Sequence, residues 1–342
     1  MESKKFHDLW YQSEQSYLNH PALVKIIEDV YKVKRLHNVI EHENISIGIP
    51  AFYVNSLFSG RKITSMPFNF YPPLIGSDNN DVAMESLIRQ AKSMGGKCYV
   101  EFKSFSDISP EFRHLYDIQT IQPSRVSLLT LEGEYEEQRK KYQKRFSQKL
   151  STHWKKSVEM NIKIESARTF EELKEWYMIL LKLYRDKHKM IAQPFRLFEK
   201  LIMIHEEQDF SDLLIAKIQD NIIGGIVILK DKMIWEYSWG ATLEKYNHLG
   251  VNKLLLDYAI QKAILARARI FGFGSSSPTD KNLRFFKSRW GSEEHTIYYH
   301  YWNYTPKEID LNSSYLTVRN LYSKLPLFIL AHLPNLIIPH LV

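Results

Sequence analysis

Residues 238–301 constrain the fold most strongly, because strand-like and helix-like patterns alternate along them. A β-like run leads into a tight turn, and residues 251–266 then carry apolar side chains at helical spacing. A second β-like run follows at 270–277, then a short helical stretch at 283–291 and a Tyr-rich β-like run at 296–304. This order of strand, turn, helix, strand, short helix and strand predicts an α/β unit.

The composition limits the classes of protein that the chain can represent. Its 342 residues are too many for one small domain and fit two, and 44% hydrophobic residues exclude a disordered protein. The net charge is +7 and the pI is about 9.1. We therefore expect an anionic partner: a nucleic acid, a nucleotide or pyrophosphate substrate, or the anionic inner face of a membrane.

The single cysteine, Cys98, excludes a disulfide within the chain and a thiolate metal site. No His, Asp or Glu cluster has the spacing of metal ligands, so we expect no metal. The N-terminus lacks the apolar segment of a secretory signal, and no run of 18 apolar residues predicts a spanning helix. These features favour a cytoplasmic location, with the inner face of the membrane as an alternative.

The first part of the chain, residues 1–137, is predicted to be a domain of its own. The expected elements are strands at 33–40 and 45–54 in a hairpin, a helix at 82–94 that ends at a Gly-Gly pair, and strands at 99–105 and 124–131. Residues 61–71 contain too many aromatic side chains for an ordinary solvated loop. They predict either a packed loop or a wall of a substrate cleft, with Ser65, Phe68, Asn69 and Tyr71 as the candidate cleft residues.

A basic stretch at 138–156 follows, and the domain boundary is expected at or within it. It contains Arg139, Lys140, Lys141, Lys144, Arg145, Lys149, Lys155 and Lys156 with no acidic residue between them. Apolar side chains recur every four positions, which predicts one amphipathic helix with a basic face. That face is either a solvated surface or a docking surface for phosphates, a tRNA or acidic lipid.

The second part, residues 138–306, is predicted to be the domain that carries the chemistry. It begins with a strand and a helix that Thr169 caps, because Glu172 lies three residues later in a capping box. Three strands between 213 and 239 then form an antiparallel meander. The remaining residues, 307–342, end in an apolar tail that prolines interrupt. The tail is expected either to close the core as short helices or to lie on a membrane as an interfacial foot.

Together these segments resemble the FemAB-like group of the GNAT superfamily of N-acyltransferases. The most specific motif lies in residues 271–301, where Phe-x-Phe-Gly-x-Ser precedes Phe-Lys-x-x-Trp-Gly and a Tyr-rich strand. The other matching segments are 61–71, 138–165, 177–198 and 221–263. Relatives often have Asp where Gly272 stands and Arg where Ser275 stands, which leaves the acceptor of this protein open. The long helical arm of cell-wall bridge-forming members has no room in this chain.

The resemblance implies an α/β (α+β) fold of two tandem GNAT-like domains, with mixed, mostly antiparallel sheets flanked by helices. It also implies a transferase that moves an acetyl or aminoacyl group to an amine of a sugar or cell-envelope precursor, as in polysaccharide biosynthesis. The implied donor is acetyl-CoA, another acyl-CoA or an aminoacyl-tRNA. The implied acceptor is a small-molecule or lipid-linked amino sugar.

The resemblance also assigns candidate site residues. Gly250, Val251 and Asn252 form the turn expected to cradle a pyrophosphate at a helix N-terminus, although Asn252 replaces a residue that is usually small. Lys287 is expected beside the reacting carbonyl or phosphate, and Asp257 or His248 is expected to act as the base. The remaining expected substrate-binding residues are Arg185, His188, Ser65, Phe68, Asn69, Tyr71, Tyr237, Gly274, Ser275, Ser276 and Trp290.

Two other classes of protein remain open at this point. The basic stretch and the many aromatic residues also fit an RNA-binding module, which would bind RNA in a salt-dependent way. The eroded glycine turn and the apolar tail also fit a catalytically inactive, membrane-associated assembly protein. Salt-dependent RNA binding and liposome flotation with and without residues 325–342 distinguish these classes from a soluble enzyme.

Overall fold

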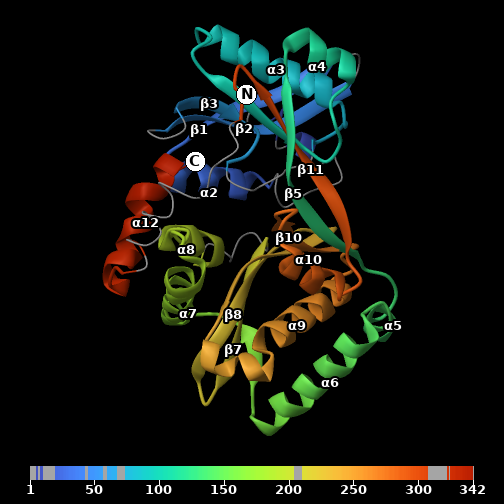
Figure 1. The fold of residues 1–342 in the computed structure, drawn as a ribbon, viewed down its shortest axis with the longest axis vertical. Helices are drawn as coiled ribbons and strands as arrows, with labels where there is room; N and C mark the ends of the chain where they lie inside the picture. Colours follow the sequence, from blue (N-terminus) through green and yellow to red (C-terminus); the bar gives the residue numbers. More distant parts are fainter. Residues whose placement is uncertain are drawn as a thin grey trace.

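The computed structural model describes residues 5–6, 8–10, 20–42, 45–56, 60–67, 74–203, 210–306, 322 and 324–341. Three of the expected cleft residues, Phe68, Asn69 and Tyr71, lie outside these ranges. Throughout the described part, the chain forms one continuous mixed sheet with helices on both faces (Figure 1).

The sheet has eleven strands among the described residues, in the order β1-β2-β3-β4-β11-β5-β10-β9-β8-β7-β6. The strands are β1 (Lys34–His42), β2 (Ile45–Ser56), β3 (Gly60–Thr64), β4 (Tyr99–Ser104), β5 (Gln119–Thr130), β6 (Lys163–Ser166), β7 (Ser211–Ile218), β8 (Asn221–Lys230), β9 (Ile234–Thr242), β10 (Ile270–Ser276) and β11 (Glu293–Trp302). Only β3–β4 and β9–β10 pair in parallel among these strands. The prediction of a mixed, mostly antiparallel sheet is therefore confirmed.

Strands β5 and β11 join the two halves of the sheet. β11 comes from the second part of the chain, yet it pairs with β4 and β5 of the first part, and β5 also pairs with β10. The backbone ladder is therefore unbroken from β1 to β6. Such a ladder resists hinge motion at the seam, because bending there would break hydrogen bonds between strands.

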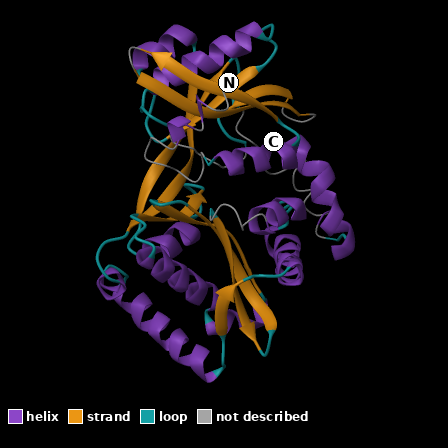
Figure 2. Cartoon of the chain, turned by 180° about the vertical axis from the view of Figure 1, so that it is seen from behind, coloured by secondary structure: helices purple, strands orange, loops and turns teal. Residues whose placement is uncertain are grey.

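Helices cover both faces of the sheet. They are α2 (Pro21–Tyr31), α3 (Asn80–Ser93), α4 (Pro110–Tyr116), α5 (Tyr135–Lys140), α6 (Lys144–Glu159), α7 (Phe170–Leu183), α8 (Phe195–Met203), α9 (Val251–Leu265), α10 (Lys281–Ser288) and α12 (Leu327–Leu341), with a π-helical turn η2 (Tyr184–His188) and a 3-10 turn η3 (Glu244–Leu249). Figure 1 shows α7 and α8 on one side of β7 and β8, and α9 and α6 on the other. The view from behind in Figure 2 shows helices covering both ends of the sheet.

Two hydrophobic cores lie on the two faces of β7–β9. One contains Leu173, Trp176 and Leu180 of α7 and continues to α2 and α12. The other contains Leu255 and Ala259 of α9 with the apolar face of α6. Burying these side chains contributes roughly 1.5–3 kcal/mol for each large aliphatic or aromatic residue, so the two cores fix the position of α9 relative to α7.

The single helix expected over residues 138–156 is a wrong prediction. The structure divides this stretch into α5 and α6, which are separated at residues 141–143. The cause is a tertiary contact, since the backbone N–H of Gln143 donates to the carbonyl of Arg289, 2.9 Å away, instead of continuing one helix. The amphipathic pattern itself is retained, because Phe146 and Leu150 of α6 are buried.

The tail forms α12, which packs against α2, α7, α8 and β2. Leu330 and Ile338 are buried in the core that α7 and α8 share. The tail therefore closes the core, as one of the two expectations stated. No helix among the described residues is both long and apolar enough to cross a membrane.

Candidate functional site

A pocket of about 1140 Å³ lies between the C-terminal end of α7, the end of β9 and the beginning of α9. Its wall is formed by Ile179, Lys182, Leu183, Asp186, Lys187, His188, Tyr237, Gly240, Ala241, Thr242, Leu243, Glu244, Lys245, Asn247, Gly250, Val251, Asn252, Lys253 and Phe286. The structure thus brings together five of the residues that the sequence singled out: His188, Tyr237, Gly250, Val251 and Asn252. A cavity of this size can hold a ligand as large as a nucleotide cofactor.

Gly250 creates the turn that aims the start of α9 at the pocket. Its φ is +70°, a left-handed conformation that favours glycine, and it separates η3 from α9. A Cβ at this position would lie 2.7 Å from the ring of His153, so only glycine fits. The first N–H groups of α9, at Val251 and Asn252, have no partner within the helix, and both residues line the pocket.

The pocket wall carries more positive than negative charge. Lys182, Lys187, Lys245 and Lys253 line it together with His188, against the two acids Asp186 and Glu244. The carboxylate of Asp186 is already paired, since the guanidinium of Arg185 donates to it at 2.5 Å. The surplus of cations and the N-terminus of α9 act in the same direction, because both stabilise a bound anion.

The residue order of α7 explains why these cations reach the pocket. The capping box of Thr169 and Glu172 starts α7, and η2 ends it with a π-helical turn. π-Helical turns are rare and occur often at functional sites. Here the turn directs Asp186, Lys187 and His188 toward the pocket wall, while burial and then the charge of Lys187 lower the pKa of His188.

Strands β9 and β10 separate beside the pocket. They pair in parallel only from Ile270 to Gly272, and β9 continues to Thr242 without β10. Both strands are irregular here, with a bulge in β9 and a second one in β10, where Gly274 has φ +68°. The hydroxyls of Ser238 and Ser276 are buried and have no hydrogen-bond partner in the described structure. The gap therefore offers backbone and side-chain donors to a bound carbonyl.

Lys287 on α10 is almost fully buried beside this gap, with 3% of its surface exposed. Its ammonium donates to the carbonyls of Gly274 and Ser275 at 2.7 and 2.9 Å, so two of its three N–H groups are used. Burial lowers the pKa of Lys287 to about 8, and nearby carboxylates, first Glu236, partly offset this. The preceding residue, Phe286, lines the pocket, whereas Lys287 itself is not among the lining residues.

Glu236 is a site residue that the sequence analysis missed. It lies on β9 directly before Tyr237 and is 6% exposed. Its carboxylate occupies the space above Gly272, where a Cβ would lie 2.8 Å from Oε2. Among the charged groups that favour the ammonium of Lys287, Glu236 has the largest effect. The glycine at 272 therefore makes room for a carboxylate next to Lys287.

The other expected site residues lie away from the pocket wall. Trp290 is fully buried in an aromatic cluster with Tyr142, Phe146 and Phe273, which gives it a packing position. Ser65 is buried in the first half of the sheet, where its hydroxyl accepts from the backbone N–H of Lys103 at 3.1 Å. His248 is exposed on η3.

Asp257 is fully buried on α9, and its surroundings are those of a structural residue. Its carboxylate accepts from Trp154 Nε1 at 2.7 Å and from the hydroxyl of Tyr135 at 2.5 Å, with Tyr142 at 3.4 Å. Burial raises the pKa of Asp257, and these hydrogen bonds lower it in part. The carboxylate ties α5 and α6 to α9, and Asp257 is not among the residues that line the pocket.

Asp257→Asn should lower the free energy of unfolding and leave turnover unchanged. The amide nitrogen of Asn would replace an oxygen that accepts from the indole of Trp154 or from a tyrosine hydroxyl, and an unmatched buried donor costs about 1–3 kcal/mol. We expect that loss in urea denaturation, with kcat per folded molecule within twofold of wild type. A large fall in kcat at unchanged stability would instead make Asp257 a catalytic base.

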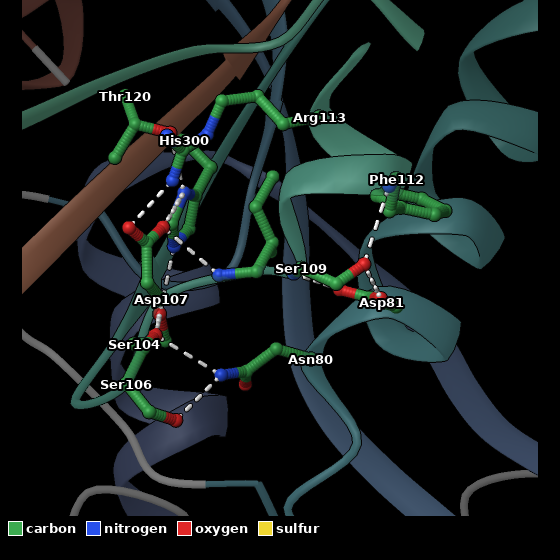
Figure 3. Close-up of polar contacts among 11 residues, drawn as sticks. Asn80, Asp81, Ser104, Ser106, Asp107, Ser109, Phe112, Arg113, Thr120 and His300 are labelled. Atoms are coloured by element: carbon green, nitrogen blue, oxygen red, sulfur yellow. Dashed lines mark hydrogen bonds and ion pairs between the residues drawn. The ribbon is translucent and has the colours of Figure 1, made fainter. Parts of the chain in front are cut away.

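A second polar cluster lies in the first half of the sheet, around His300 on β11 (Figure 3). Ser104 Oγ and Thr120 Oγ1 lie 2.9 and 3.0 Å from its two ring nitrogens, and Asp107 lies 3.8 Å away. Ser104 donates its single proton to the carbonyl of Ser106 at 2.6 Å, so His300 must donate to Ser104. A serine in that state is not activated as a nucleophile, and the cluster therefore holds the loop after β4 in place.

His300 should make the protein less stable in mild acid. Burial lowers its pKa to about 4, with Asp107 opposing and Arg113 adding to the shift. An unfolded histidine has a pKa near 6.5, so the unfolded state takes up the proton first and stability falls between pH 6.5 and 4, by roughly 3 kcal/mol in total. Urea denaturation of wild type and His300→Gln at pH 7 and 4.5 should show a smaller pH effect in the variant. Equal pH effects in both proteins would contradict this assignment.

Comparison with known proteins agrees with this geometry. Residues 141–282 match the family model of the acetyltransferase (GNAT) domain. No curated protein matches the chain in sequence. The crystal structure of FemX is similar in fold, with a TM-score of 0.61 at 12% identity over 83% of this chain and 95% of FemX. The structure of L-PGS from Bacillus licheniformis has a TM-score of 0.57 at 11% identity, over 94% of this chain and 97% of L-PGS. The C-terminal domain of a putative lysylphosphatidylglycerol synthetase from Agrobacterium fabrum has a TM-score of 0.56 at 12% identity, over 89% of this chain and 92% of that domain.

The matched GNAT domain contains β9, the turn at Gly250, α9 and β10, which are the elements that build the pocket. Residues 141–282 therefore match an acetyltransferase (GNAT) domain, and the fold of the chain is similar to that of FemX. The similarity of the whole fold to FemX and to the two synthetase structures agrees with the FemAB-like fold that the sequence resemblance indicated.

Proposed function

We propose that the chain transfers an acyl group from a phosphorylated carrier to an amine, and that the carrier binds in the pocket at the N-terminus of α9. The observation that carries the proposal is the convergence of Lys182, Lys187, Lys245 and Lys253 on the free N–H groups of that helix. The pyrophosphate of an acyl-CoA fits this arrangement of donors. When bound, the carrier supplies the activated acyl ester.

The residues around the gap between β9 and β10 have different roles in the proposed reaction. The third N–H of Lys287, together with backbone donors of β9, stabilises the negative charge that develops on the carbonyl oxygen. The carboxylate of Glu236 takes the proton that the attacking amine must lose. Tyr237, whose hydroxyl packs over Gly240, borders the position of the acyl group.

The acceptor in this proposal is an amino group of a sugar or another cell-envelope precursor, either free or lipid-linked. The FemAB-like architecture supports an acceptor of this class. One structural neighbour is named a lysylphosphatidylglycerol synthetase, a name that describes an aminoacyl group on a lipid, which supports a lipid-linked acceptor. The unbroken sheet joins the first half of the chain to the half with the pocket, which supports a contribution of the first half to acceptor binding.

An aminoacyl-tRNA is the second candidate for the donor. The outer face of α6 carries Lys144, Arg145, Lys149, Lys155 and Lys156, all exposed. None of the five forms an ion pair with a described carboxylate. Unpaired cations on one helix face favour a polyanionic partner such as the phosphate backbone of an RNA.

Calorimetric titration distinguishes the two donors. We expect acetyl-CoA and CoA to bind with 1:1 stoichiometry, and binding to weaken at least fivefold in Lys245→Gln, because one pocket cation is lost. The matched control is Lys232→Gln, which removes the same charge from the turn before β9. Transfer of labelled acetyl to UDP-amino sugars then tests the acceptor. If aminoacyl-tRNA binds and no CoA species does, then the proposed donor is aminoacyl-tRNA and not an acyl-CoA.

A further inference from the structure

A cluster of three cations begins at the pocket wall, at Lys253, and extends beyond it. It consists of Lys149 on α6, Lys253 at the start of α9, and Arg289 directly after α10. The charges of Lys149 and Arg289 both reach Lys253, since they add to burial in lowering its pKa. None of the three pairs with a carboxylate in the described part of the chain. Three cations that repel one another gain stability when an anion binds between them.

The guanidinium of Arg289 is positioned by aromatic rings and not by an ion pair with a described carboxylate. The guanidinium carbon lies 5.0 Å from the ring centre of Phe146, 5.2 Å from Phe285 and 5.5 Å from Phe286. Its Nε is buried without a hydrogen-bond partner among the described residues. Phe286 lines the donor pocket, whereas Phe285 is 57% exposed. The cluster therefore continues the pocket wall and offers an open aromatic face beside a cation.

His153 is an independent sign that this corner is built for an anion. It is 6% exposed, and neither ring nitrogen has a hydrogen-bond partner in the described structure. Its ring lies against Gly250, directly behind the N-terminus of α9. Burial and the charges of Lys253, Lys149 and Lys156 lower its pKa to about 4, while the nearby Leu249 carbonyl opposes this in part. His153 is thus a buried, neutral side chain with lysines around it.

We propose that Lys149, Lys253 and Arg289 bind a further phosphate of the carrier, a phosphomonoester on its nucleoside, and that Phe285 stacks on the base. This inference rests on the proposed function, because it assumes that a phosphorylated carrier occupies the neighbouring pocket. It adds a second anion subsite that shares Lys253 with the first. The carrier that satisfies both subsites is a nucleotide with a pyrophosphate and a separate terminal phosphate.

Continuity with the pocket favours such a nucleotide over an unrelated anion. Lys253 belongs to both subsites, and the neighbouring residues Phe285 and Phe286 face one subsite each. An exposed aromatic ring beside a guanidinium is a suitable surface for a nucleobase, since stacking on aromatic and guanidinium planes is a common mode of base recognition. An isolated inorganic phosphate would use the cations and leave Phe285 without a function.

The test compares CoA with 3′-dephospho-CoA, which lacks the terminal phosphate, by calorimetry on the full chain. Wild type should bind CoA at least tenfold more tightly than dephospho-CoA. Lys149→Gln should weaken the binding of CoA about fivefold or more and leave the affinity for dephospho-CoA within twofold of wild type. Lys149 is exposed, so the variant should fold, and Lys155→Gln, nearer the C-terminal end of α6, is the control with the same change of charge. Arg289→Lys should show the same selective loss, because it keeps the charge but loses the planar group.

Each other outcome overturns the inference in a distinct way. Equal affinity of wild type for both ligands, or equal weakening by Lys149→Gln and Lys155→Gln, removes the subsite and leaves the proposed donor pocket intact. Absence of binding by either CoA species removes the CoA-type donor and the subsite together. An RNA oligonucleotide that binds in a Lys149-dependent way, with no CoA binding, assigns the cluster to a phosphodiester chain instead.

Discussion

Replacing Lys287 with methionine is expected to lower kcat by about 10²–10³-fold, the range found when one donor to a developing oxyanion is removed. The ammonium of Lys287 donates to the carbonyls of Gly274 and Ser275, and these two hydrogen bonds fix the direction of its third N–H. Methionine has a similar length and suits a buried site, so the fold should persist. Steady-state kinetics with the identified donor, together with thermal unfolding, measure both effects.

Lys281→Met is the matched control for this experiment. Lys281 lies on the same helix, α10, but is exposed, so its replacement should leave kcat within twofold of wild type. Because burial sets the pKa of Lys287 at about 8, kcat of the wild type should also decline above pH 8 as the ammonium loses its proton. Turnover that is unchanged in Lys287→Met would remove this residue from the mechanism.

Replacing Gly250 with alanine is expected to weaken donor binding by tenfold or more and to reduce stability by about 1–3 kcal/mol. The alanine Cβ would meet the ring of His153 at 2.7 Å, in a backbone conformation that alanine rarely adopts. Relief of that contact must shift the first turn of α9, and with it the N–H groups that face the carrier. Calorimetry of CoA and urea denaturation report the two losses separately.

Two further variants isolate the cause of that effect. Gly95→Ala has a comparable backbone strain, with φ +85°, but no atom within 4 Å of the new Cβ, so it should lose stability without losing donor affinity. The double variant Gly250→Ala with His153→Ala should recover part of the stability, because the clash is removed. If Gly95→Ala and Gly250→Ala affect donor binding equally, then the turn at Gly250 has no special role.

Local patterns in the sequence were sufficient to predict much of the fold. The capping box of Thr169 and Glu172 forms as expected, because both partners lie within one turn of the same helix. The turn at Gly250 and the helix after it were also predictable, since a glycine before an apolar helical repeat marks a left-handed residue. Lys287 was correctly expected next to an apolar region, because two aromatic residues precede it.

Tertiary contacts decide the rest, and no local pattern contains them. The break between α5 and α6 depends on a hydrogen bond from Gln143 to Arg289, which lies far along the chain. Glu236 has the sequence of an ordinary strand residue, and only the parallel register with Gly272 shows that its carboxylate lies over that glycine. The cations of the pocket come from α7, η2, η3 and α9, so their convergence requires the packing of the sheet.

Hydrogen–deuterium exchange of the full chain with and without CoA tests the central claim most directly, namely that the N-terminus of α9 binds the acyl carrier. The account predicts slower exchange in peptides that cover residues 182–188 and 237–253, with no change in α3 or α4. In Gly250→Ala this protection should require at least tenfold more ligand, in line with its weaker binding. Protection confined to other segments, with residues 245–253 exchanging at the rate of the free protein, would contradict the account.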